Sequence, residues 1–175
     1  NHGLIISADT ASEVVAESKK IQSIVYNYLK KQKDEFKIES IRRMFNFKEN
    51  FYISKNHELQ KLISDNQYLT NYLATSPDVV IFCGPRPFNI NPREIKNELQ
   101  NYFETFSVYP KIYLYNKSVY FLAYSQKQAD MIEDVFLSHI FVILYCPQNI
   151  NFLSMTEILD LISRDDEKYR LKLTQ

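Results

Sequence analysis

The chain has 175 residues, of which 45% are apolar and 24% are charged, and this composition is typical of a folded globular protein rather than a disordered one. Its 21 basic and 21 acidic residues cancel, so no net charge attracts the whole chain to a polyanion. Residues 1–76 are slightly basic and residues 77–175 slightly acidic. Any binding of nucleic acid would therefore have to rest on local patches.

The two cysteines, Cys83 and Cys146, have neither the spacing of a metal site nor that of a disulfide framework, and we expect both to be free thiols. No apolar run reaches the length that spans a membrane, and no signal-peptide pattern opens the chain. These features predict an intracellular protein, in the nucleus or the cytoplasm, that does not contact a membrane.

Catalytic motifs are missing from the sequence. His2, His57 and His139 lie far apart, and neither a nucleophile elbow nor a phosphate-binding loop occurs. Gly84 is the one glycine that follows Gly3, so the chain cannot form a glycine-rich phosphate cradle. We therefore predict that the protein is not an enzyme and holds neither a metal ion nor a small-molecule cofactor.

The N-terminal region begins with a predicted helix over residues 10–31. Thr10 and Glu13 have the spacing of a capping box, which marks the start of a helix. Apolar and small residues then recur at helical spacing along one stripe. The residues of this stripe are Ala11, Val14, Val15, Ser18, Ile21, Val25, Tyr28 and Leu29. The lysines between them are interpreted as the solvated side of the helix, with phosphate binding as the alternative.

Two shorter helices and an extended piece are predicted next. Residues 38–45 repeat the helical pattern, and residues 51–53 predict a short strand. Residues 54–56 offer caps for a third helix, which Asp65 and Asn66 are placed to interrupt. Residues 1–76 are therefore predicted to form a helical or winged-helix-like region.

A second set of elements is predicted after residue 77. Residues 81–87, 108–115, 117–124 and 141–146 are rich in β-branched and aromatic residues and predict strands. Asn91 and Pro92 start a helix before the second of these strands, and Ser125 starts another after the third. Ser154 and Glu157 cap a last helix. The predicted order is strand, helix, strand, strand, helix, strand, and then the extra helix.

Two of these strands resemble the signature strands of the RNA-recognition motif. Residues 117–124 follow that family's pattern of basic, aromatic and aliphatic positions, and residues 81–87 place Phe82 at the aromatic position of the other strand. The matching residues of the longer pattern are Lys117, Phe121, Leu122 and Tyr124. Val119 departs from it, at a position where the family usually has a stacking ring. Residues 78–146 thus resemble a fold whose sheet stacks RNA bases on aromatic rings.

A helical region before such a sheet is similar to the La module, in which a winged-helix domain and an RNA-recognition motif act together on RNA. Tyr26 and Tyr28 fall loosely where that family has a tyrosine pair, but its acidic-asparagine-leucine signature is missing. The alternative is a helical bundle packed on the sheet domain. The predicted fold is therefore α+β, with residues 1–76 packed on a βαββαβ, ferredoxin-like antiparallel sheet formed by residues 77–175 with its C-terminal helix.

The resemblance implies a non-catalytic module that binds single-stranded RNA within a larger ribonucleoprotein. Rings would stack bases, and basic side chains would hold phosphates or base edges. The predicted RNA-binding residues are Phe82, Phe121, Lys117, Tyr113, Lys111, Tyr115 and Arg86. This hypothesis requires Phe82 and Phe121 to lie side by side on an open face of the sheet. In the alternative arrangement the last helix lies across that face.

A second hypothesis assigns the same fold to binding or dimerisation between proteins, without RNA. It is favoured by Val119 at the expected ring position, by the very short Asn116-Lys117 turn and by the neutral net charge. The partner would then be a protein subunit of a larger complex.

Overall fold

The computed structural model of the chain describes residues 6–33 and 37–166. Contacts between Cα atoms divide the chain into two units, Asn1–Lys37 and Ile38–Gln175, whereas the sequence suggested a boundary at residues 76 and 77. The two units are described separately below.

The first unit contains helix α1 (Ala11–Lys33). Its predicted start is confirmed, because the Thr10 backbone N–H donates to Glu13 Oε2 at 3.0 Å and the Glu13 N–H donates to Thr10 Oγ1 at 3.3 Å. Val15, Ile24 and Val25 on this helix are exposed. The unit therefore presents a helix with apolar side chains in solvent.

The second unit is built on a four-stranded mixed sheet with the order β1-β4-β3-β2. Strand β1 (Asn50–Ile53) pairs antiparallel with β4 (Ser118–Ala123), and β4 pairs antiparallel with β3 (Ile112–Tyr115). Strand β2 (Phe88–Asn89) adds to the far edge of β3 in parallel. The α+β class is thus confirmed, but the sheet is mixed, not antiparallel.

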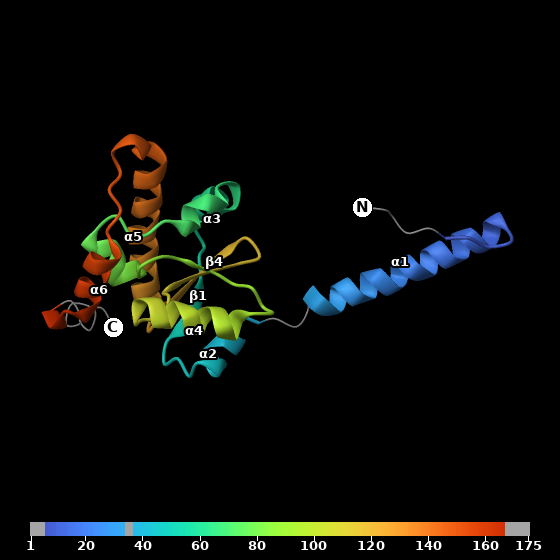
Figure 1. Cartoon of the computed structure of the whole chain (residues 1–175), viewed down its shortest axis with the longest axis horizontal. Coiled ribbons are helices and arrows are strands. Elements are labelled where there is room, and N and C mark those ends of the chain that lie inside the picture. Colours follow the sequence, from blue (N-terminus) through green and yellow to red (C-terminus); the bar gives the residue numbers. More distant parts are fainter. Residues whose placement is uncertain (1–5, 34–36, 167–175) are drawn as a thin grey trace. The chain divides into compact units, whose positions relative to one another are not determined.

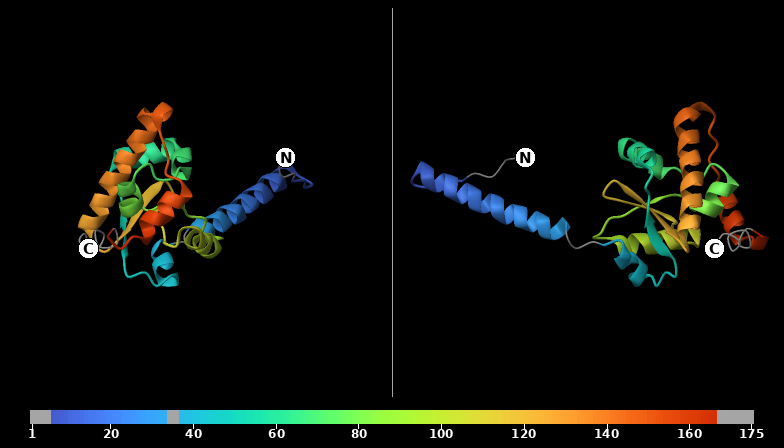
Figure 2. Two further views of the ribbon diagram at one scale, coloured as in Figure 1. Left: turned by 60° about the vertical axis from the view of Figure 1, so that its left-hand side comes forward. Right: turned by 180° about the vertical axis from the view of Figure 1, so that it is seen from behind.

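Helices surround this sheet on both sides (Figure 1). Helix α2 (Glu39–Met44) contacts β1, α3 (His57–Asp65) leads into the 3₁₀ turn η1 (Gln67–Asn71), and α4 (Ile95–Phe106) and α5 (Gln126–Tyr145) are the long helices. Figure 2 shows the sheet between α4 and α5. A short 3₁₀ turn, η3 (Pro147–Asn149), leads from α5 towards the last helix.

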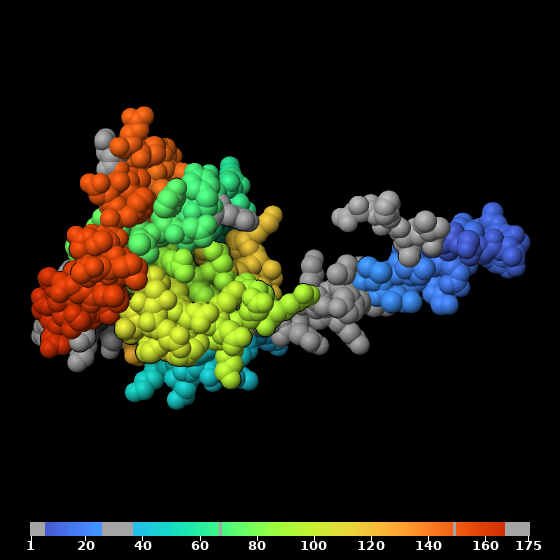
Figure 3. Space-filling model, in the orientation of Figure 1, coloured from blue at the N-terminus to red at the C-terminus, as the bar shows by residue number. Residues whose placement is uncertain are grey.

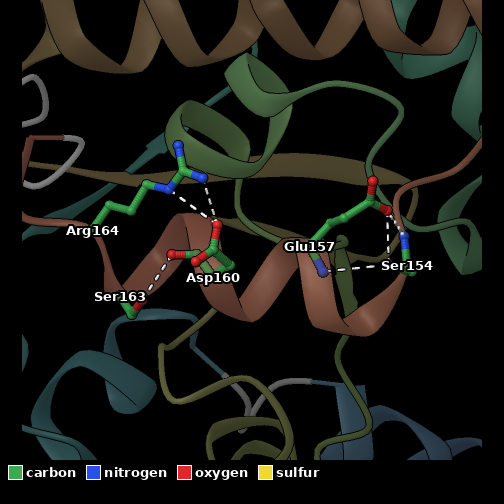
Figure 4. A network of polar contacts seen from close by, with 5 residues as sticks. All are labelled: Ser154, Glu157, Asp160, Ser163 and Arg164. Atoms are coloured by element: carbon green, nitrogen blue, oxygen red, sulfur yellow. Dashed lines mark hydrogen bonds and ion pairs between the residues drawn. The ribbon is translucent and has the colours of Figure 1, made fainter.

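Three further predicted caps are confirmed, but the helix start predicted at Asn91 and Pro92 is wrong, because α4 begins at Ile95 with Glu94 at its N-cap and without a side-chain cap hydrogen bond. Asn56 Oδ1 accepts from the Leu59 N–H at the start of α3, and Ser125 Oγ accepts from the Gln128 N–H at the start of α5. Helix α6 (Met155–Ser163) begins with a complete capping box formed by Ser154. Figure 4 shows this box together with the Arg164–Asp160 ion pair that follows it.

Two predicted strands are helical in the structure. Residues 79–83 form the π-helical turn η2 (Val79–Cys83), so the strand predicted over residues 81–87 is wrong. Residues 141–145 are the last turns of α5, so the strand predicted over residues 141–146 is wrong as well. Both runs are short and apolar, and such runs occur equally in buried helices and in buried strands. Helix α6 packs mainly against η2.

Candidate functional site

The predicted base-stacking platform is not formed. Phe82 lies in η2, outside the sheet, and Phe121 lies on β4 with 1% of its surface exposed. Paired residues of neighbouring strands share a face, and Phe121 pairs with Ile112 while Tyr113 pairs with Tyr120. Phe121 and Tyr113 therefore point to opposite faces of the sheet.

Each of these faces is covered by a helix. On one face the Tyr113 ring contacts the Phe88 ring at a centroid distance of 5.8 Å, and Phe88 contacts Tyr102 of α4 at 6.0 Å. On the other face α5 packs against β4 (Figure 2). Tyr113 and Phe121 are therefore core residues and offer no open ring.

The polar groups around Tyr113 are also enclosed. The Tyr113 hydroxyl is fully buried and makes no hydrogen bond, and burial raises its pKa well above its ordinary value. Burial also lowers the pKa of the Lys111 ammonium group, an effect that the Glu49 carboxylate partly offsets. Lys111 is therefore poorly placed to contact a phosphate in solvent.

The remaining predicted residues are spread over the surface. Tyr115 is half-buried at the end of β3, and Lys117 is exposed in the turn between β3 and β4, where it has a positive φ of 64°. The Arg86 guanidinium lies over the rings of Tyr102 and Phe106, at 6.0 Å and 5.8 Å from their centroids. The structure therefore does not bring the predicted residues together into one site.

Three exposed rings lie together elsewhere on the second unit. We call Tyr68, Tyr72 and Phe152 the aromatic row. The Tyr72 and Phe152 rings stack at 4.8 Å with an interplanar angle of 7°, and the Tyr68 ring stands at 90° to Tyr72 at 6.3 Å. Their exposed fractions are 54% for Tyr68, 36% for Tyr72 and 37% for Phe152. Single exposed apolar residues are common on protein surfaces, whereas three aromatic side chains in contact form a patch, and such patches often mark binding sites.

The local structure explains why these rings are outside. The Asn66 side chain donates to the Leu62 carbonyl and ends α3, and the buried Leu69 and Thr70 then anchor η1 so that Tyr68 faces solvent. The Leu153 N–H donates to the Ala74 carbonyl at 2.9 Å, and this bond brings residues 150–153 alongside residues 72–74. The row thus joins two segments that lie far apart in the sequence.

Residues next to the row line two recesses. The larger, of about 570 Å³, is lined by residues of η2 and α5 and by two short segments, among them Thr75, His139 and Asn151. The smaller, of about 360 Å³, includes Asn71 and Arg86. Figure 3 shows the face of this unit on which α3, α4 and α6 reach the surface.

His139 is neutral in the larger recess. Its Nδ1 lies 2.9 Å from the Thr75 hydroxyl, and burial lowers its pKa to about 4. The imidazole therefore adds no positive charge to the recess at pH 7.

The charges of the segments that build the row have one sign. Residues 62–85 and 128–163 contain no lysine and no arginine. Their acidic residues are Asp65, Asp78, Asp130, Glu133, Asp134, Glu157 and Asp160. The cations that bound the two segments in the sequence are Lys61, Arg86, Lys127 and Arg164. The row is therefore an apolar surface in acidic surroundings.

Sequence reasoning missed this site, because it looked for rings on strands. Tyr68 lies in the 3₁₀ turn η1 and Tyr72 directly follows it, and both rings are exposed. The useful signal was the absence of cations over the two long segments, which sets them apart from the rest of an evenly charged chain.

Within the described ranges, no helix is both long and apolar enough to cross a membrane, and no group of three or more histidines, cysteines or acidic residues could hold a metal ion. Comparisons with protein-family models, with curated proteins and with solved structures found no match to the chain.

Proposed function

We propose that the chain is a protein-interaction module whose second unit binds a partner protein at the aromatic row. The observation that carries this proposal is the contact of three exposed rings, Tyr68, Tyr72 and Phe152. Aromatic side chains of this kind supply much of the binding energy of protein interfaces, because they bury a large area and lose little conformational entropy.

The charges favour a protein partner over a nucleic acid. A phosphate backbone gains affinity from lysine and arginine, and the two segments that build the row contain neither. Their carboxylates would instead attract basic side chains at the rim of the interface. The expected partner segment combines aromatic or aliphatic residues, which cover the rings, with lysine or arginine beside them.

A displayed library of random peptides tests this proposal. We expect selection on the wild-type chain to enrich peptides with apolar and basic residues, and we expect these peptides to lose at least about tenfold in affinity for the double variant Tyr72→Ser, Phe152→Ser. Binding is measured by fluorescence anisotropy with purified chains.

Phe103→Ser is the matched control. Phe103 is also 37% exposed and also stacks on a tyrosine, Tyr109, at 4.7 Å, but it lies near the end of α4. Peptides that bind the wild type and the double variant equally, or that depend on Phe103 instead, contradict the proposal.

RNA binding is the second candidate function, and one observation favours it. Arg86 lies in the smaller recess beside Asn71 and Asn101, and carboxamides with a guanidinium are groups that contact base edges. The succession of α4, β3, β4 and α5 also agrees with the inner part of the element order of the RNA-recognition motif. Bases would then stack on the aromatic row, not on the sheet.

Titration with labelled single-stranded RNA separates the two candidates. RNA binding would weaken steeply with added salt and would be lost in Arg86→Ala, with Arg93→Ala as the control for a lost surface charge. A protein interface of largely apolar character responds weakly to salt. We expect no RNA binding at 0.1 M salt, roughly the ionic strength at which exposed charges are screened beyond about 10 Å.

A further inference from the structure

Within residues 6–33, the described part of the first unit, no second element covers the apolar stripe of α1. Helix α1 is 23 residues long. On its apolar stripe, Ile24 is 59% exposed and Val15 is 53% exposed. Most helices in proteins are stabilised by packing of their apolar face rather than by their own helical propensity. The stripe therefore calls for a partner.

The spacing of the stripe is that of a coiled coil. Ala11, Val14, Ser18, Ile21 and Val25 follow each other at alternating intervals of three and four residues, which is the repeat of the inner positions of a heptad. Val15 and Ile24 flank these positions and widen the apolar face. The expected partner is accordingly another helix of similar pattern.

The charges along the helix sequence are divided into blocks. Acidic residues occur only before residue 18, and basic residues only after it. The acidic residues are Asp9, Glu13 and Glu17, and the basic residues are Lys19, Lys20, Lys30, Lys31 and Lys33. A parallel pair of such helices would place like charges together, whereas an antiparallel pair sets the acidic start of each helix against the basic end of the other.

We propose that α1 pairs antiparallel with α1 of a second copy of the chain, with the twofold axis close to Ser23. In this register Ile21 of one copy packs against Val25 of the other, and Ile24 lies beside its own equivalent near the axis. Residues 13–17 then lie opposite residues 29–33 of the second copy, so the acidic block of each helix faces the basic block of the other. This pairing is independent of the aromatic row and joins two second units into a dimer.

Sedimentation velocity over a range of concentrations tests the dimer. We expect the wild-type chain to dimerise and Ile21→Asp to weaken the dimer by at least about 100-fold, because each dimer loses two buried isoleucines and gains two buried charges. Ser23→Asp is the matched control: it introduces the same charge two residues away, at an exposed position outside the stripe, and should leave the dimer intact. A monomeric wild type, or an Ile21→Asp chain that dimerises as well as the wild type, overturns the proposal.

Because Ile21→Asp also weakens the helix itself, a second measurement tests the direction of the pair. Nitroxide labels are attached at Ser12→Cys or at Ser23→Cys, two exposed serines, in a chain with Cys146→Ser, since Cys146 is exposed and Cys83 is buried. In the antiparallel pair the labels at residue 23 lie level with each other along the axis, on the outer sides of the two helices, whereas those at residue 12 are displaced by about 33 Å along the axis at 1.5 Å per residue. Short distances at both positions show a parallel pair, and no intermolecular distance shows no pair; either result overturns the proposal.

Discussion

Two groups of aromatic residues in the second unit have opposite surroundings. Tyr113 and Phe121, on the two central strands, are fully buried. The rings of the aromatic row lie on a 3₁₀ turn and an irregular segment, and more than a third of each remains exposed. A ring on a strand is buried where a helix covers its face of the sheet, whereas a ring in a loop is exposed unless a further element covers it. The exposed group is thus the better candidate for binding.

The largest expected effect concerns the buried group. Phe121→Ala should lower the free energy of unfolding by about 3 to 5 kcal/mol, because it leaves a cavity between the sheet and α5. Urea denaturation followed by circular dichroism measures the loss. Phe152→Ala in the aromatic row should cost about 1 kcal/mol or less, since its ring is partly in solvent and loses mainly its stack on Tyr72. Equal losses for the two variants would remove the distinction between core and surface rings.

His139 should make the stability depend on pH. Its pKa is about 4 in the folded chain and 6.5 for the free side chain, so the unfolded state binds the proton more readily. The contribution is complete above pH 6.5, falls as the pH drops towards 4 and does not fall further below that value; the total is about 3 kcal/mol at 1.36 kcal/mol per pKa unit.

Replacement of His139 by glutamine isolates this effect. The His139→Gln chain should show a flatter dependence of unfolding free energy on pH between 4 and 6.5 than the wild type does. Identical slopes would mean that the imidazole is not enclosed in the recess beside the row.

The capping box of α6 should contribute less. Ser154→Ala removes the hydroxyl that accepts the Glu157 N–H at 3.3 Å and should lower the free energy of unfolding by about 1 kcal/mol. Thr156→Ala, an exposed change two residues further on, is the control. Because α6 packs on η2 close to Phe152, a drop in peptide affinity in Ser154→Ala would show that α6 also positions the row.

The smallest effect should have the opposite sign. Tyr113→Phe removes a buried hydroxyl that has no hydrogen-bond partner and should leave stability unchanged or raise it by about 1 kcal/mol. A clear loss of stability in thermal unfolding would show that the Tyr113 hydroxyl has a hydrogen-bond partner. Tyr113 and Lys111 would then belong to a buried polar site.

The sequence predicted local features well. The caps at Thr10, Asn56, Ser125 and Ser154 depend on residues three positions apart, and each was found where the pattern placed it. Strands β3 and β4 were also predicted, because β-branched and aromatic residues are concentrated between two turns. Features that depend on neighbouring residues could therefore be inferred without coordinates.

Features that depend on distant contacts could not be inferred. The run at residues 141–145 continues the helical spacing of Ile132, Phe136 and Ile140 without a breaker, but its high apolar content favoured a strand. The position of Phe152 beside Tyr72 depends on a backbone bond between residues 74 and 153, which no local pattern signals. The candidate site was missed for this reason.

The Asn116-Lys117 turn has a consequence for changes in chain length. Both residues have positive φ values, 49° and 64°, and these two residues alone reverse the chain between β3 and β4. One inserted residue would shift the pairing by a single step and would turn every side chain of one strand to the other face. Insertions and deletions in any homologous chain should therefore be absent from this hairpin. They should occur in loops whose length does not set the pairing of two strands.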